Sequence, residues 1–138
     1  MKILFICKGN MVRSQIAEAF YNKLSGTSDA MSAGTYVGAP DEPSDRVLKD
    51  ILPEYFFAKV DAYGCDLREN VTKHLTPQLL LESDIAITMT EEPYVPDFLK
   101  ESKAVVWNIP NEASSQNIKE IYRRVKSLIV EMQESKLR

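Results

Sequence analysis

KILFICKGNMVRS, residues 2–14, combines a short apolar run, a glycine-containing turn and the start of a helical pattern. Residues 2–6 are typical of a strand buried on both faces, because the apolar run is short and continuous. Ile16, Phe20 and Leu24 then repeat at helical spacing, and Ser25-Gly26 supplies a stop. Residues 7–14 are therefore predicted to turn directly from a strand into a helix.

The rest of the chain alternates between strand and helix patterns. We expect a weakly signalled strand over 29–33 and further strands over 84–89 and 104–109. Helices are expected over 47–52, where Pro53 ends the pattern, from Thr76-Pro77 through Leu81, and along an apolar stripe from Ile118 to Met132.

This alternation predicts an α/β fold with three layers: a parallel sheet of about four strands with helices on both faces. Residues 1–138 are interpreted as one domain, since this length suits a single core. Ligands of such sheets bind beyond the carboxyl ends of the strands, where the strand order reverses. Cys7 directly follows the first strand, so the turn after it is the expected site.

Composition narrows the function classes. A net charge of -3 argues against a general nucleic-acid binder, which needs a clustered cationic face. The two cysteines are too few for a disulfide framework, and the first apolar run is too short for a signal peptide or a membrane span. We expect a cytoplasmic protein that binds neither nucleic acid nor membrane and uses no metal or cofactor.

The turn places Cys7 and Arg13 six residues apart at the start of a helix. Inward-pointing amides at a helix N-terminus form an anion site, and an arginine fork can hold two phosphate oxygens. The positive field favours the nucleophilic thiolate of Cys7, and Ser14 is placed to donate to that thiolate when it departs. The residues expected to bind phosphate are Lys8, Gly9, Asn10, Met11, Val12 and Arg13.

Several motifs together resemble the low-molecular-weight protein tyrosine phosphatase family, which shares its fold with thiol-dependent arsenate reductases. They are, in order, CKGNMVRS, QIAEAF, SAGT at 32–35, LTP at 75–77, SDIAITMT and VWNIP. The resemblance implies that Asn10, Ser14 and Ser32 form a network that fixes the loop. It also implies that Asn70 stands where a supporting histidine is common, and that Tyr36 forms a wall of the substrate cleft.

The sequence departs from this family at the general acid. The resemblance places an aspartate there, but this chain has Asn111, and an amide is no useful proton donor. Glu112, one residue further, is a candidate substitute, and an ordinary solvated loop carboxylate is the alternative. Activity on poor leaving groups is expected to fall by about 10²- to 10⁴-fold without a donor.

Three functions remain open from sequence. The first is a phosphatase for phosphotyrosine on a protein, or for a small aryl phosphate, acting through a phosphocysteine on Cys7. The second is an arsenate reductase that uses Cys7 and a small-molecule thiol, because no further cysteine follows the third strand and Cys65 is interpreted as a bystander. The third is a non-catalytic binder of phosphate or phosphoprotein. All three bind an oxyanion such as phosphate or arsenate.

Overall fold

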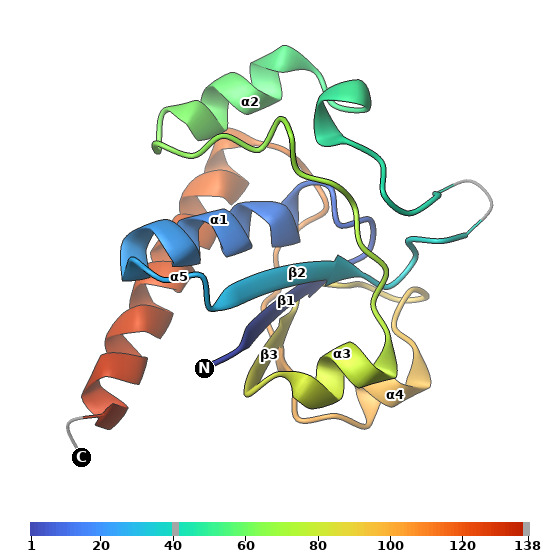
Figure 1. Ribbon diagram of the computed structural model, residues 1–138, viewed down its shortest axis with the longest axis vertical. Helices are drawn as coiled ribbons and strands as arrows, with labels where there is room; N and C mark the ends of the chain where they lie inside the picture. Colours follow the sequence, from blue (N-terminus) through green and yellow to red (C-terminus); the bar gives the residue numbers. More distant parts are fainter. Residues whose placement is uncertain (40–41, 137–138) are drawn as a thin grey trace.

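The structure is a computed structural model, which describes residues 1–39 and 42–136 (Figure 1). Its centre is a parallel four-stranded sheet in the order β2-β1-β3-β4. The strands are β1 (Ile3–Cys7), β2 (Ala30–Gly34), β3 (Ile85–Thr88) and β4 (Val105–Val106). The predicted α/β class and the number of strands are thus confirmed.

Strand β1 explains why the sheet is covered on both faces. All five of its residues are buried, and alternate side chains point to opposite faces. Ile3 and Phe5 belong to a core that also includes Phe20 and Trp107, whereas Leu4 and Ile6 belong to a second core. The continuous apolar run in the sequence therefore supplies two cores from one strand.

Helices form the outer two layers (Figure 1). On the face of the larger core lie α1 (Arg13–Ser25), α2 (Glu54–Asp61) and α5 (Ser115–Lys136). Helices α3 (Pro77–Glu82) and α4 (Asp97–Lys100) cover the smaller core on the other face. The predicted three-layer arrangement is confirmed.

The helix boundaries expected at α1 and α3 are confirmed by their capping geometry. Gly26 follows α1 with φ 70°, in the left-handed region that a glycine adopts without strain. Thr76 caps α3, because its side chain accepts a hydrogen bond from the Leu79 amide at 3.1 Å and Pro77 occupies the first turn.

The helix predicted over 47–52 was wrong. Val47 is extended and pairs with Val71, and only the short 3₁₀ turn η1 (Leu48–Asp50) follows. The Leu48 amide bonds the Asn70 carbonyl at 2.8 Å, so this segment pairs with a neighbouring segment instead of continuing as a helix. The sequence analysis interpreted Pro53 only as the end of a helix. In the structure it is the N-cap residue of α2, which begins at Glu54.

The strand predicted over 104–109 is much shorter in the structure. Pairing with β3 ends at Val106, apart from one further bond from the Trp107 amide to the Thr88 carbonyl at 2.9 Å. The Ile109 amide then bonds the Trp107 carbonyl two residues earlier, at 3.0 Å, which bends the chain away from the sheet.

Cys7 ends β1 between β2 and β3, where connections leave the sheet in both directions. This is the position at which open parallel sheets bind ligands. Among the helices in the described residues 1–39 and 42–136, none is long and apolar enough to cross a membrane.

Candidate active site

The thiol of Cys7 lies beside the hydroxyl of Ser14 in the first turn of α1. Cys7 is 2% exposed, and its Sγ is 3.0 Å from Ser14 Oγ. Asn10 Nδ2 donates to the same Oγ at 2.8 Å. Because the serine oxygen already accepts from Asn10, its own proton is free to be donated to the sulfur. The pair can therefore stabilise negative charge on Cys7.

Asn10 holds the turn in its shape. It is fully buried and has φ 51°, in the left-handed region that asparagine tolerates better than most residues. Its Oδ1 accepts from the Lys73 amide at 2.8 Å and from Gln15 Nε2 at 3.2 Å. Asn70 Nδ2 in turn donates to Gln15 Oε1 at 3.1 Å. Asn70 thus supports the turn through Gln15, a buried polar residue that the sequence analysis missed.

Replacing Asn10 with alanine is expected to destabilise the fold by about 2–4 kcal/mol, because buried groups lose their partners and alanine is strained at this positive φ. Urea unfolding monitored by circular dichroism measures the change. The control is Asn108→Ala, since Asn108 is exposed and its substitution should fall within about 0.5 kcal/mol of the parent. Similar losses in the two variants would contradict this role for Asn10.

Ser32 makes a different contact from the one expected. Its hydroxyl donates to Glu18 Oε1 at 3.1 Å rather than joining Asn10 and Ser14. Burial raises the pKa of the Glu18 carboxyl, while Lys73, whose Nζ is 3.9 Å from Oε1, and the Ser32 bond oppose that shift. Among the described residues, Ser32 is linked to the turn by way of Glu18 and Lys73, whose amide donates to Asn10.

Gly34, at the end of β2, allows the turn to pack against the sheet. A Cβ on Gly34 would lie 2.7 Å from the Lys8 carbonyl oxygen and 3.0 Å from the Asn10 amide nitrogen. The first distance is shorter than side chains tolerate beside fixed backbone, and the second is at the limit. The glycine of the SAGT motif is therefore required by the close approach of two backbone segments.

The turn surrounds a small cavity of about 50 Å³, which we call the loop cavity. Within the described residues, no group accepts a hydrogen bond from the amides of residues 8–13, so these donors are available to an anion. Across residues 1–39 and 42–136, no group of three or more histidine, cysteine or acidic side chains is placed to hold a metal. The cavity is lined by Cys7, Lys8, Gly9, Met11, Val12, Arg13, Glu42 and Asn111.

Arg13 presents one edge of its guanidinium for binding. The residue is 2% exposed, and its Nη1 donates to the carbonyls of Met89 and Ile109 and pairs with Glu91 Oε2 at 2.9 Å. Its Nε and Nη2 are buried and have no hydrogen-bond partner among the described residues. These two nitrogens form one edge of the guanidinium, an arrangement that can donate to two oxygens of one oxyanion. A thiol, an unpaired cationic edge and free amides thus line one cavity.

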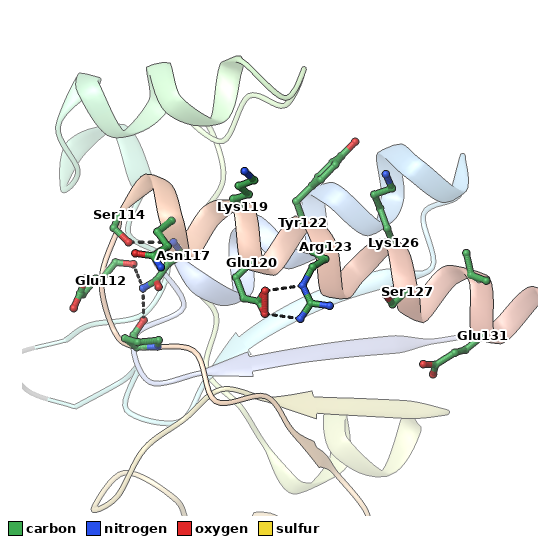
Figure 2. A pocket seen from close by; sticks show the side chains of 13 residues that line it. Glu112, Ser114, Asn117, Lys119, Glu120, Tyr122, Arg123, Lys126, Ser127 and Glu131 are labelled. Carbon is green, nitrogen blue, oxygen red and sulfur yellow. Dashed lines mark hydrogen bonds and ion pairs between the residues drawn. The ribbon is translucent and has the colours of Figure 1, made fainter.

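The two residues considered at the acid position lie at different sites. Asn111 lines the loop cavity, whereas Glu112 lines a groove of about 1060 Å³ along α5. Figure 2 shows Glu112 at one end of this groove, beside Ser114 and Asn117. Asn117 Nδ2 donates to the Glu112 carbonyl at 3.1 Å, which ties this part of the loop to the helix. The structure therefore does not bring Glu112 together with Cys7 in the loop cavity.

Tyr36 is part of an aromatic pair beside the turn. Its ring meets that of Tyr94 edge to face, with centroids 5.1 Å apart. Lys8 Nζ lies 4.2 Å from the Tyr94 centroid and 5.4 Å from that of Tyr36. The sequence analysis missed Tyr94, although an aromatic residue in the connection after β3 was the available signal. Both rings are half-buried and adjoin a residue of the loop cavity.

Comparison with known proteins identifies relatives with this arrangement of elements. The model of the family described as low molecular weight phosphotyrosine protein phosphatase matches residues 2–105. An arsenate reductase of Halalkalibacterium halodurans is 25% identical over 134 residues, which cover 92% of this chain and 88% of that protein.

Solved structures give the same picture. The thioredoxin-dependent arsenate reductase Cg_ArsC1' of Corynebacterium glutamicum superimposes with a TM-score of 0.71 and 27% identity; the match covers 97% of this chain but only 62% of that longer one. A low molecular weight protein tyrosine phosphatase from T. tengcongensis has a TM-score of 0.60 and 20% identity, covering 98% and 99% of the two chains. One fold therefore carries both activities among the relatives.

Proposed function

The chain belongs to the low molecular weight phosphotyrosine protein phosphatase family, and on this premise we propose that it hydrolyses phosphate monoesters, with Cys7 as nucleophile. One observation carries the proposal: the buried Nε and Nη2 of Arg13 have no partner among the described residues, and Arg13 and Cys7 line the same cavity. An oxyanion bound by that edge and by the amides of residues 8–13 lies against the sulfur.

The reaction divides into two displacements at phosphorus. The Cys7 thiolate attacks, a sulfur–phosphorus bond forms, and the bond to the leaving oxygen breaks. Arg13 and the amides stabilise the charge on the equatorial oxygens in the transition state. Water then attacks the phosphocysteine, and the electron pair returns to Cys7 sulfur, where the Ser14 hydroxyl 3.0 Å away stabilises it. The products are an alcohol or phenol and inorganic phosphate.

The aromatic pair of Tyr36 and Tyr94 suits an aryl phosphate. Lys8 lines the loop cavity and its ammonium lies over both rings, so the pair would form a wall next to a bound phosphate. Aromatic groups gain contact area and about 0.5–1.5 kcal/mol from such a wall. We therefore assign phosphotyrosine on a protein, or a small aryl phosphate, as the substrate class. The protein would act in the cytoplasm, a reducing compartment in which Cys7 is not oxidised.

Replacing Tyr94 with alanine is expected to raise KM for 4-nitrophenyl phosphate about threefold to tenfold, with kcat changed little, because the ring contact is lost in both ground and transition state. Steady-state kinetics measure it. Glycerol phosphate, which has no ring, should show no such rise. Tyr55→Ala is the control, since Tyr55 is 66% exposed on α2. An equal rise of KM for both substrates would contradict an aromatic wall.

Arsenate reduction is the second candidate, because two relatives, 25% and 27% identical to this chain, are arsenate reductases. Asn111 in the loop cavity also suits a reaction that needs no strong general acid. The Cys7 thiolate would form a sulfur–arsenic bond as water leaves dihydrogen arsenate, which itself carries the two protons of that water. A small-molecule thiolate would then attack the Cys7 sulfur and form a mixed disulfide, while the electron pair of the sulfur–arsenic bond leaves with arsenic as arsenite. A second molecule of that thiol would release the Cys7 thiolate and form the disulfide of the small molecule. Cys65 is half-buried, and burial raises its pKa, which disfavours a thiolate there.

Two assays on the same preparation distinguish the candidates. Release of nitrophenol from 4-nitrophenyl phosphate tests the phosphatase, since this leaving group scarcely needs protonation. Arsenate-dependent consumption of glutathione tests the reductase. The phosphatase proposal requires turnover in the first assay, faster than in the second. Phosphate binding by calorimetry without turnover in either assay would identify a non-catalytic binder and reject both activities.

A further inference from the structure

Glu42 is a second carboxylate at the loop cavity, in the connection after β2. It lines the cavity together with Cys7 and Arg13. Its main chain is held to that connection, because its amide bonds the Ala39 carbonyl at 3.0 Å and its carbonyl accepts from the Gly38 amide at 2.6 Å. The sequence analysis singled out no acidic residue in this region.

The side chain of Glu42 lies over the phosphate-binding turn. Its Oε1 is 3.9 Å from Lys8 Nζ, and the side chain is only 18% exposed. Its Oε2 would be 3.3 Å from a Cβ placed on Gly9, so this oxygen faces the turn directly. Oε2 is buried and has no hydrogen-bond partner among the described residues. A buried carboxyl oxygen without a partner is costly, which points to a partner supplied by the substrate.

The other carboxyls near Cys7 are placed differently. Glu91 is paired with Arg13 and lines a neighbouring cavity rather than the loop cavity. Glu112 lines the groove along α5 (Figure 2). Asn111 shares the loop cavity but has no acidic proton. Within the described residues, Glu42 is therefore the carboxyl that shares the cavity with the nucleophile.

We propose that Glu42 is the proton donor of this active site; the inference rests on the phosphatase function proposed above. As the Cys7 sulfur bonds to phosphorus, the phosphorus–oxygen bond breaks and its electron pair stays on the leaving oxygen, which takes the proton of the Glu42 carboxyl. In the second step the Glu42 carboxylate accepts a proton from the attacking water, and the sulfur leaves with its electron pair. The carboxyl and the thiolate are both regenerated.

The decisive experiment compares leaving groups in Glu42→Gln, which keeps the size of the side chain and removes the proton. With phenyl phosphate, a poor leaving group, kcat/KM, which reports the first displacement and not the hydrolysis of the phosphocysteine, is expected to fall about 10²- to 10⁴-fold. With 4-nitrophenyl phosphate, the fall should stay below about tenfold. Retained turnover of the activated substrate also shows that the variant is folded. Glu92→Gln is the matched control, since Glu92 is exposed and paired with Lys100; neither substrate should be affected.

The possible results separate this inference from the phosphatase proposal. Equal losses on the two substrates, or no loss on phenyl phosphate, would overturn the role of Glu42 while leaving a working phosphatase. A selective loss in Glu112→Gln but not in Glu42→Gln would assign the donor to Glu112 and overturn it as well. A parent protein inactive on both substrates would reject the phosphatase function itself.

Discussion

Serine in place of Cys7 should lower kcat for 4-nitrophenyl phosphate by about 10⁴-fold or more, to the limit of detection. A serine hydroxyl is not ionised at neutral pH, and among the described residues the hydrogen-bond partner of the Cys7 sulfur is the Ser14 hydroxyl at 3.0 Å, which is too weak a base to ionise it. Removal of a nucleophile is among the largest single losses known in enzymes that form covalent intermediates. Nitrophenol release, followed at several enzyme concentrations, measures the effect.

Two controls make this result specific to the nucleophile. Phosphate binding, measured by calorimetry, should survive in Cys7→Ser, because the amides of residues 8–13 and Arg13 supply the contacts. Cys65→Ser should keep the parent rate, since Cys65 is half-buried away from the loop cavity residues. Turnover in Cys7→Ser within tenfold of the parent would mean that hydrolysis proceeds without a cysteine nucleophile.

Arg13→Lys should lower kcat/KM for the same substrate by about 10³-fold. Lysine keeps the positive charge but lacks the Nε and Nη2 edge that is unpaired in the cavity. Loss of a single oxyanion donor typically costs about 10²- to 10³-fold in kcat, and here two donors are removed together. Steady-state kinetics measure the loss, and the thermal midpoint with added phosphate reports on binding.

Arg123→Lys, the same exchange at an exposed position on α5, is the control for Arg13→Lys. Arg123 is paired with Glu120 at 2.7 Å on the exposed face of the helix, so Arg123→Lys should leave the kinetics unchanged. In Arg13→Lys, the rise of the thermal midpoint caused by phosphate should shrink, because stabilisation by a bound ligand grows with the logarithm of its affinity. An unchanged kcat/KM in Arg13→Lys would show that a positive charge alone is sufficient for catalysis and that the paired donors of the guanidinium are not needed.

Features specified by adjacent residues were predictable from the sequence. The run 2–6, the turn after it and the spacing of Ile16, Phe20 and Leu24 lie within one continuous segment, and the structure forms β1, the turn and α1 there. Thr76-Pro77 and Gly26 likewise mark helix ends through local backbone chemistry. The position of Cys7 and Arg13 at one turn follows from these local features.

Features that depend on distant segments were not predictable. The Leu48 segment bonds to residues 68–70 in place of forming a helix, and β4 stops where the chain bends at Trp107. The family resemblance assigned Ser32 to the network around the loop, whereas its hydroxyl donates to Glu18 on α1. Glu42 and Tyr94 reach the site from two separate connections. An aromatic residue in the connection after β3 was a weak signal for Tyr94, but nothing in the sequence around Glu42 indicates its approach. Tertiary packing decides these contacts.

The central place of β1 has a consequence for the order of folding. Its neighbours are β2, which follows after one helix, and β3, whose Ile85 pairs with Ile3. During synthesis, β1, α1 and β2 can associate early, but one edge of β1 stays unpaired until the segment carrying β3 has emerged. Long-range parallel pairing of this kind slows folding. The same strand that ends at Cys7 is thus exposed to wrong partners for the longest time, and the nascent chain is most prone to aggregate before β3 arrives.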